Sequence, residues 1–324
     1  MHPIKINTCI GILIISMLFN CFPAFSQPAD TSNYEKDYRR FVDSEEPLAW
    51  LQYKDNKLCY SDFNIIKKYM PKPSHTLKYG TENLQQLDIY THRGRKYAPV
   101  IFFIHGGANY KTQVLPAVRS WLSLGYTVVS IDHRCIPENK FSEQLGDCFL
   151  ALKWVTENIC KYGGDGDRIA ISGLSVGAYM AAILVAETKW HKEYNIDIRK
   201  VKCWIPMSGF YSAELQDNYT TPIIAGYLKI TREQAGNDAS PLKHITGNEP
   251  PSLIIHGRDD WAVPRTNAII LYKKLKESGS VTQLHMLKGY WHSNIFMVYD
   301  SPDHIPTMLI KKFLAKHIPT EENH

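Results

Sequence analysis

The chain has 324 residues, 44% of them hydrophobic and 21% charged, with a formal net charge of +5. This length and composition allow one large hydrophobic core or two smaller ones. The lysines and arginines are dispersed, without an arginine-rich tract, and this pattern argues against nucleic acid as a partner.

The first 26 residues have the three-part pattern of a secretory signal peptide. A basic residue, Lys5, precedes an apolar stretch at 10–19, and Pro23 follows before the small residue Ser26. We expect cleavage after Ser26 and export to the periplasm or the exterior. Because spanning a bilayer needs about 20 apolar residues, the stretch predicts no stable membrane span.

Seven cysteines are present, and Cys9 and Cys21 would leave with the signal peptide. Bulky residues precede Cys21 where a lipoprotein signal has small ones, which argues against lipid attachment there. Five cysteines would remain in the mature chain: Cys59, Cys135, Cys148, Cys160 and Cys203. Their odd number leaves at least one thiol unpaired, and one disulfide between two of the others is an alternative that the sequence does not decide. Because most lie among apolar residues, we interpret them as small buried hydrophobic side chains.

After an N-terminal extension at 27–75, which has weak periodicity, the chain shows short runs that are apolar almost throughout. Strands have this composition when both faces of their sheet are covered. The predicted strand-containing runs are residues 87–90, 100–107, 126–134, 168–175, 201–209, 252–260 and 282–289.

Helical patterns alternate with these runs. Apolar residues recur at helical spacing within 141–162, and further helices are expected at 176–187, at 267–276 and around 309–314. The alternation predicts an α/β fold with a mostly parallel central sheet and helices on both faces. A long polar insertion at 210–251 interrupts it, and we expect a lid or binding loop there.

A glycine-framed serine stands at the end of one predicted strand. Residues 173–177 read Gly-Leu-Ser-Val-Gly, with a strand before them and a helix after them. A nucleophilic serine at such a sharp turn has a strained backbone, and its neighbours must be small. The alternative is an ordinary turn with a solvated serine. The strand–turn–helix setting favours Ser175 as a nucleophile.

A serine nucleophile needs a base, and the base needs an acid to orient it. Asp259 and Asp260 follow one predicted strand, and His292 follows the last one. This gives the chain order serine, acid, histidine that parallel-sheet hydrolases use. Four other histidines lie within a strand, at a strand end or near the C-terminus, where we expect structural or surface roles (His256, His285, His304 and His317).

Backbone donors for an oxyanion are predicted at two places. Gly106 and Gly107 follow the strand within 100–107, and Val176 follows the serine. Backbone N–H groups at these positions would stabilise the negative charge of a tetrahedral intermediate. An ordinary glycine turn is the alternative for 106–107, and the presence of Ser175 favours the oxyanion role.

Taken together, these motifs resemble the HGG-type serine esterase branch of the α/β-hydrolase superfamily. That branch includes carboxylesterases, hormone-sensitive-lipase-like enzymes, carbohydrate esterases and kynurenine formamidases. The resemblance runs over about 76–318 and includes a stretch that ends in Asp147. It implies one catalytic domain at 76–320, with the α/β-hydrolase fold and a lid insertion after the sixth strand. The family's motif spacing favours Asp260 over Asp259 as the acid.

The chain departs from the family pattern at three positions. Ala108 and Asn109 stand where the family often has a glycine and an aromatic residue, and His133 stands where tyrosine is usual. The resemblance places these changes near the acyl pocket. Asn109 and His133 are therefore the predicted pocket residues.

The resemblance implies an exported serine hydrolase that cleaves small or short-chain carboxylic esters, with acylated carbohydrates among the candidate substrates. It implies no metal and no organic cofactor. An aryl formamidase or a peptidase could use the same triad, although a signal peptide argues against an intracellular formamidase. A non-catalytic binding module of the same fold is the alternative from another class, and the retained Ser175 and His292 argue against it.

Overall fold

The computed structural model describes residues 71–107, 110–136, 138–212, 239–292, 294–297 and 304–321. The predicted signal peptide, nearly all of the N-terminal extension and most of the predicted lid lie outside these ranges. Asn109, one of the two predicted pocket residues, also lies outside them.

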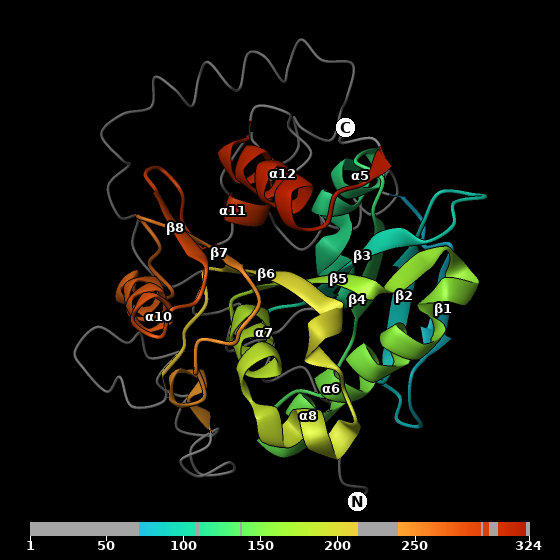
Figure 1. Ribbon diagram of the computed structural model, residues 1–324, viewed down its shortest axis with the longest axis horizontal. Coiled ribbons are helices and arrows are strands. Elements are labelled where there is room, and N and C mark those ends of the chain that lie inside the picture. Colours follow the sequence, from blue (N-terminus) through green and yellow to red (C-terminus); the bar gives the residue numbers. More distant parts are fainter. Residues whose placement is uncertain are drawn as a thin grey trace, which may run out of the picture. The chain divides into compact units, whose positions relative to one another are not determined.

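Within these ranges, eight strands form one sheet in the order β1-β2-β4-β3-β5-β6-β7-β8 (Figure 1). Strands β1 and β2 pair antiparallel, as do β2 and β4, and all other neighbours are parallel. The predicted mostly parallel sheet is therefore confirmed. The strands are β1 (His75–Lys78), β2 (Gln86–Tyr90), β3 (Ala98–Ile104), β4 (Thr127–Ile131), β5 (Gly164–Leu174), β6 (Val201–Met207), β7 (Ser252–Gly257) and β8 (Thr282–Leu287).

Helices cover both faces of this sheet, as predicted (Figure 1). One face carries α5 (Leu115–Ser123), α11 (Asn294–Met297) and α12 (Ile305–His317). The other carries α6 (Phe141–Asn158), α7 (Val176–Ala186), α8 (Thr188–Tyr194) and α10 (Thr266–Glu277). Strand β1 and helices α5, α8 and α11 were not predicted from the sequence.

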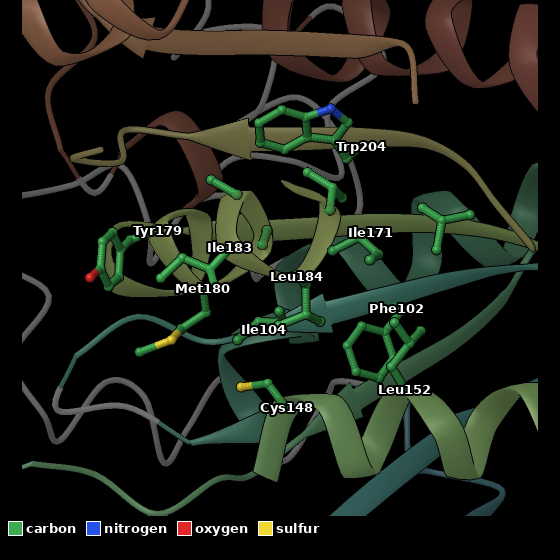
Figure 2. Close-up of a cluster of buried hydrophobic side chains, with 14 of the residues drawn as sticks. Phe102, Ile104, Cys148, Leu152, Ile171, Tyr179, Met180, Ile183, Leu184 and Trp204 are labelled. Carbon is green, nitrogen blue, oxygen red and sulfur yellow. The ribbon is translucent and has the colours of Figure 1, made fainter. Parts of the chain in front are cut away.

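Helix α7 is buried on every side, since all eleven of its residues are buried. A helix that is apolar all round belongs in the core rather than at a surface. Figure 2 shows its side chains packed between strands of the sheet and helix α6. The labelled residues are Phe102, Ile104, Cys148, Leu152, Ile171, Tyr179, Met180, Ile183, Leu184 and Trp204.

Two glycines allow α7 to approach the sheet closely. A Cβ atom on Gly177 would lie 2.0 Å from the carbonyl oxygen of Ile104 in β3. A Cβ atom on Gly173 would lie 2.4 Å from the carbonyl carbon of Gly177. Backbone occupies both spaces, so no side chain can be accommodated without moving the helix away from the strands.

The four cysteines within the described ranges are free thiols: Cys135, Cys148, Cys160 and Cys203. Cys148 and Cys203 are buried, in agreement with the predicted packing role, whereas Cys160 is exposed. In the same part of the chain, no helix combines the length and apolar character needed to cross a membrane.

The close approach predicts that Gly177→Ala destabilises the fold by at least about 3 kcal/mol, because the added methyl group meets the backbone of β3. Gly279→Ala is the matched control. Gly279 has φ of +88° and no atom within 4 Å of the added carbon. Its replacement should cost only the backbone strain of about 1 kcal/mol. Urea unfolding of both variants measures the difference, and equal losses would contradict the close-approach argument.

Candidate active site

The carboxyl edge of the sheet collects the predicted catalytic residues. Ser175 directly follows β5, Asp260 lies three residues after β7, and His292 follows β8. Gly106 lies two residues after β3. Because these four strands run parallel, their carboxyl ends meet at the same edge, where open α/β sheets bind ligands.

Ser175 has the strained backbone of a sharp strand-to-helix turn. Its φ is 57° and its ψ is −117°, outside the usual regions for a non-glycine residue. The Ser175 N–H donates to the carbonyl of Met207 at 2.9 Å, and the Ser175 carbonyl accepts from Ala178 and Tyr179 at 3.0 and 3.1 Å. Such strain costs about 1–3 kcal/mol and persists only where the surroundings fix it. Here the turn is tied to β6 on one side and to the start of α7 on the other.

The Asp260 carboxylate is completely buried, and both of its oxygens accept hydrogen bonds. Oδ1 accepts from the N–H groups of Ala262 and Val263 at 2.9 and 2.8 Å. Oδ2 accepts from Nδ1 of His292 at 3.0 Å. Burial alone would raise the pKa of Asp260, but the His292 hydrogen bond and nearby histidines outweigh it, and the pKa lies below its usual value.

The ionised Asp260 determines which nitrogen of His292 carries the proton. A carboxylate can only accept, so Nδ1 of His292 must be the donor. In the neutral ring Nε2 then carries the lone pair. His292 therefore has the tautomer that a general base requires.

Asp259 has a different role from its neighbour. Its Oδ2 accepts from the backbone N–H of Gly289 at 2.7 Å. This bond ties the turn after β7 to the turn after β8, three residues before His292. Asp259 thus anchors the loop, and Asp260 contacts the histidine.

His256 lies beneath the acid, at the end of β7. Its Nε2 donates to the carbonyl of Val263 at 2.9 Å and lies 3.4 Å from Oδ2 of Asp260. The side chain is fully buried, and burial lowers its pKa, so the ring is neutral. This agrees with the structural role expected for His256.

Among the described residues, no hydrogen bond joins the Ser175 hydroxyl to the ring of His292. Catalytic hydrogen bonds are often long in the free enzyme and tighten when substrate binds. The structure therefore shows the acid–histidine pair and the strained serine at one edge of the sheet.

The Gly106–Gly107 turn packs against the serine. A Cβ atom on Gly106 would lie 3.4 Å from Cβ of Ser175, and one on Gly107 would lie 3.3 Å from Cγ2 of Val176. The N–H of Gly106, however, donates to Oε1 of Gln113 at 2.7 Å. The Gly106 N–H is thus bonded to a side chain, in contrast to its predicted role as an oxyanion donor. Gly107 and Val176 are the other two predicted donors.

His133, predicted to lie in the acyl pocket, is buried in the structure. Its side chain is only 2% exposed and stacks on His105, with ring centroids 4.1 Å apart and planes 9° apart. Nδ1 of His105 hydrogen-bonds to the carbonyl of Gly106 at 2.8 Å, so the stack lies directly behind the glycine turn.

The loop that carries His133 is fixed by an ion pair between Arg134 and the buried carboxylate of Asp147. Nη2 of Arg134 lies 2.8 Å from Oδ1 of Asp147, and Nε of Arg134 donates to Oδ2 at 2.9 Å. Nε2 of Gln85 also donates to Oδ1 of Asp147 at 2.6 Å. This two-point geometry restricts both position and orientation of the guanidinium group. It explains why an acidic residue ends the family-like stretch within α6.

The parallel sheet, the strained serine and the Asp260–His292 pair together define an α/β-hydrolase. The sequence model of the BD-FAE family matches residues 87–275, more than half of the chain, and the chain belongs to this family. The resemblance inferred from the motifs is therefore confirmed at the family level.

Similar proteins are named as esterases. "Probable carboxylic ester hydrolase LipM" of Mycobacterium tuberculosis is 32% identical over 182 residues, which are 52% of this chain and 42% of LipM. "Probable isoprenylcysteine alpha-carbonyl methylesterase ICMEL1" of Arabidopsis thaliana is 26% identical over 71% of this chain and 52% of its own length. The chain thus spans about half the length of these curated relatives.

Among solved structures, the butyrate-bound esterase Est2 of Thermogutta terrifontis superimposes with a TM-score of 0.63 at 22% identity. The match covers 78% of this chain and 97% of that structure. At this level of identity the comparison shows a shared fold.

The buried histidine stack predicts a loss of stability in acid. Burial, and then the neighbouring His133, lower the pKa of His105 well below its usual value, and burial lowers that of His133. Unfolded histidines bind protons near pH 6.5. The stack's contribution is therefore present above about pH 6.5 and lost as the pH falls below it. The melting temperature should decrease as the pH is lowered from about 7.5 to 5.5, and this decrease should be smaller in the His133→Phe variant than in the wild type. Equal slopes in thermal melts of both proteins would contradict the argument.

Proposed function

We propose that this protein is an exported serine carboxylesterase that hydrolyses small or short-chain acyl esters through a Ser175–His292–Asp260 triad. The observation that carries the proposal is the buried Asp260 carboxylate bonded to Nδ1 of His292, at the sheet edge where Ser175 has a strained backbone. The esterase names of the relatives support the reaction class.

In this mechanism, Nε2 of His292 removes the hydroxyl proton as Ser175 Oγ attacks the ester carbonyl carbon. Asp260 stabilises the imidazolium that forms. The N–H groups of Gly107 and Val176 stabilise the oxyanion of the tetrahedral intermediate. His292 then protonates the leaving alcohol as the C–O bond breaks. Water, deprotonated by His292, hydrolyses the acyl-enzyme in the reverse sequence, and this chemistry requires no metal or organic cofactor.

The surroundings of the site favour a substrate with a polar or aromatic alcohol portion, and acylated carbohydrates fit that description. Tyr110 lies three residues after Gly107 and Trp261 directly follows Asp260, and these two side chains are 49% and 50% exposed. Flat aromatic side chains of this kind supply contact area for rings. The predicted lid at 210–251 contains tyrosines and polar residues rather than a continuous apolar surface.

An aryl formamidase or peptidase would use the same three side chains. Turnover of paired aryl acetates and aryl formamides separates these activities, and faster cleavage of the formamides would favour the amidase alternative. A binding module without activity would cleave neither. Export rests on the pattern in residues 1–26, and N-terminal sequencing of the mature protein should find Gln27 first.

Ser175→Ala should reduce kcat for p-nitrophenyl acetate by at least about 10⁴-fold, because the nucleophile is removed. The matched control is Ser172→Ala on the same strand, whose hydroxyl bonds to the carbonyl of Ile205 at 3.2 Å. That variant should retain most of the activity. Circular dichroism verifies folding of both. Unchanged turnover in Ser175→Ala would exclude Ser175 as the nucleophile.

The two neighbouring aspartates should respond differently to the same substitution. Asp260→Asn removes the acceptor that holds Nδ1–H of His292, and kcat should fall by about 10⁴-fold. Asp259→Asn weakens only the bond to Gly289 N and should cost less than about tenfold. Steady-state kinetics of the pair tests this, and the opposite order would identify Asp259 as the acid.

A further inference from the structure

A side-chain amide is bonded to the glycine turn behind the nucleophile. Oε1 of Gln113 accepts the N–H of Gly106 at 2.7 Å. A backbone N–H can only donate, so this contact also fixes the orientation of the amide, with its oxygen toward Gly106. Gln113 belongs to no motif of the triad or of the glycine turn.

The turn that carries Gln113 is anchored to the end of β4. This short 3-10 turn (Lys111–Val114) is held by Asp132, whose carboxylate accepts from the backbone N–H of Lys111 at 2.6 Å and from its Nζ at 2.8 Å. The hydroxyl of Ser130 also donates to the carbonyl of Lys111 at 2.7 Å. Both members of the Lys111–Asp132 pair are largely buried, so the position of Gln113 is set by the core.

Both peptide groups that flank Gly106 are thereby held. Gln113 fixes the N–H of the first peptide, and Nδ1 of His105 fixes the carbonyl of the second at 2.8 Å. That carbonyl and the N–H of Gly107 belong to one planar peptide and point in opposite directions. Fixing the Gly106 carbonyl therefore fixes the direction of the Gly107 N–H.

A glycine without such constraints would rotate freely about both of its backbone dihedral angles. A Cβ atom on Gly106 would lie 3.4 Å from Cβ of Ser175 and 3.6 Å from Oε1 of Gln113. The hydrogen bond between Gln113 and Gly106 is therefore close to the proposed nucleophile. Oxyanion donors are effective because they are preorganised. A small rotation at Gly106 would move the Gly107 donor away from the reacting carbonyl.

We propose that Gln113 is a positioning residue for the ester hydrolysis reaction: its amide oxygen holds Gly106 so that the N–H of Gly107 is directed at the oxyanion. The inference rests on the proposed function. It assigns Gly106 to positioning, and oxyanion stabilisation to Gly107 and Val176. The opposite role would be a gate, in which Gln113 leaves on substrate binding and releases the Gly106 N–H as a third donor.

The experiment compares wild type, Gln113→Leu and the nearly isosteric Gln113→Met, with Gln283→Leu as the control. Gln283 is exposed at the amino end of β8, opposite the catalytic edge. We measure kcat and KM for p-nitrophenyl acetate, the amplitude of the p-nitrophenol burst, and Ki for an aryl trifluoromethyl ketone. The ketone adds to the serine oxygen and forms a tetrahedral oxyanion that mimics the transition state.

Both Gln113 variants should lose about 10- to 100-fold in kcat, with KM within about twofold of wild type. The ketone's Ki should rise by the same factor as kcat/KM falls, because the lost interaction is specific to the tetrahedral state. The burst amplitude should stay unchanged, since the folded fraction is unaffected. Gln283→Leu should match wild type in every measurement.

Wild-type kcat and Ki in both Gln113 variants would overturn the proposal. Tighter ketone binding would also overturn it, in favour of the gate. A lower burst amplitude with unchanged kcat per active site would reveal a purely structural role. Failure of the proposed function is distinguishable, because wild type itself would then show no burst and would equal Ser175→Ala.

Discussion

The backbone contact between helix α7 and the sheet is the constraint on which the site depends. Gly173 and Gly177 allow the first turn of α7 to contact the ends of β3 and β5, with no side chain between them. Because the helix cannot move away, Ser175 must pass from strand to helix with φ of 57°. The same contact puts the first turn of α7, with the positive end of its helix dipole, beside Ser175. In the proposed mechanism, the oxyanion formed when Ser175 attacks the ester would develop close to this end of the helix.

The electrostatics of the site follow from a single buried charge. Asp260 is ionised because two backbone N–H groups and two histidine rings surround its oxygens. The buried His105, His133 and His256 are held neutral by desolvation, so they add no positive charge that would compete with the imidazolium of His292. In the proposed mechanism, Asp260 would stabilise that imidazolium without reorganisation during the reaction. A carboxylate with fewer donors would be protonated at this depth and would lose that role.

The sequence predicted the features that leave a local pattern. Continuous apolar runs mark the central strands, and the Gly173–Gly177 pentapeptide marks the turn and the buried helix. Asp260 and His292 were found because each follows a strand. Strand β1 was missed because its four residues are mainly exposed and carry no apolar run. Helices α5 and α8 have only 9 and 7 residues, too few for the helical pattern to repeat as it does over the 18 residues of α6.

Gln113 and His133 show why parts of the site escape sequence reasoning. The proposed role of Gln113 depends on one hydrogen bond, which it accepts from Gly106 seven residues earlier. The turn that carries Gln113 is held in place by Asp132, which follows β4. No motif encodes that arrangement, and a neutral amide gives no chemical signal. His133 was placed near the acyl pocket because the family has tyrosine there, but exposure depends on packing against His105. Such contacts between distant segments are fixed only by the fold.

The residues of the site therefore come from two parts of the sheet, and each part has a different role in the proposed mechanism. The loops after β7 and β8 carry the proposed acid and the proposed base, and the Asp259–Gly289 and Asp260–His292 hydrogen bonds join these loops. The loops after β3 and β4 carry the glycine turn and the residues that contact it. Gln113 bonds to Gly106, and His105 stacks on His133. The Lys111–Asp132 and Arg134–Asp147 ion pairs stabilise the segments that carry Gln113 and His133. Ser175 on β5 lies between the two parts. A substitution in the first part should change proton transfer, whereas one in the second should change oxyanion stabilisation, because separate hydrogen-bond networks hold the two sets of groups.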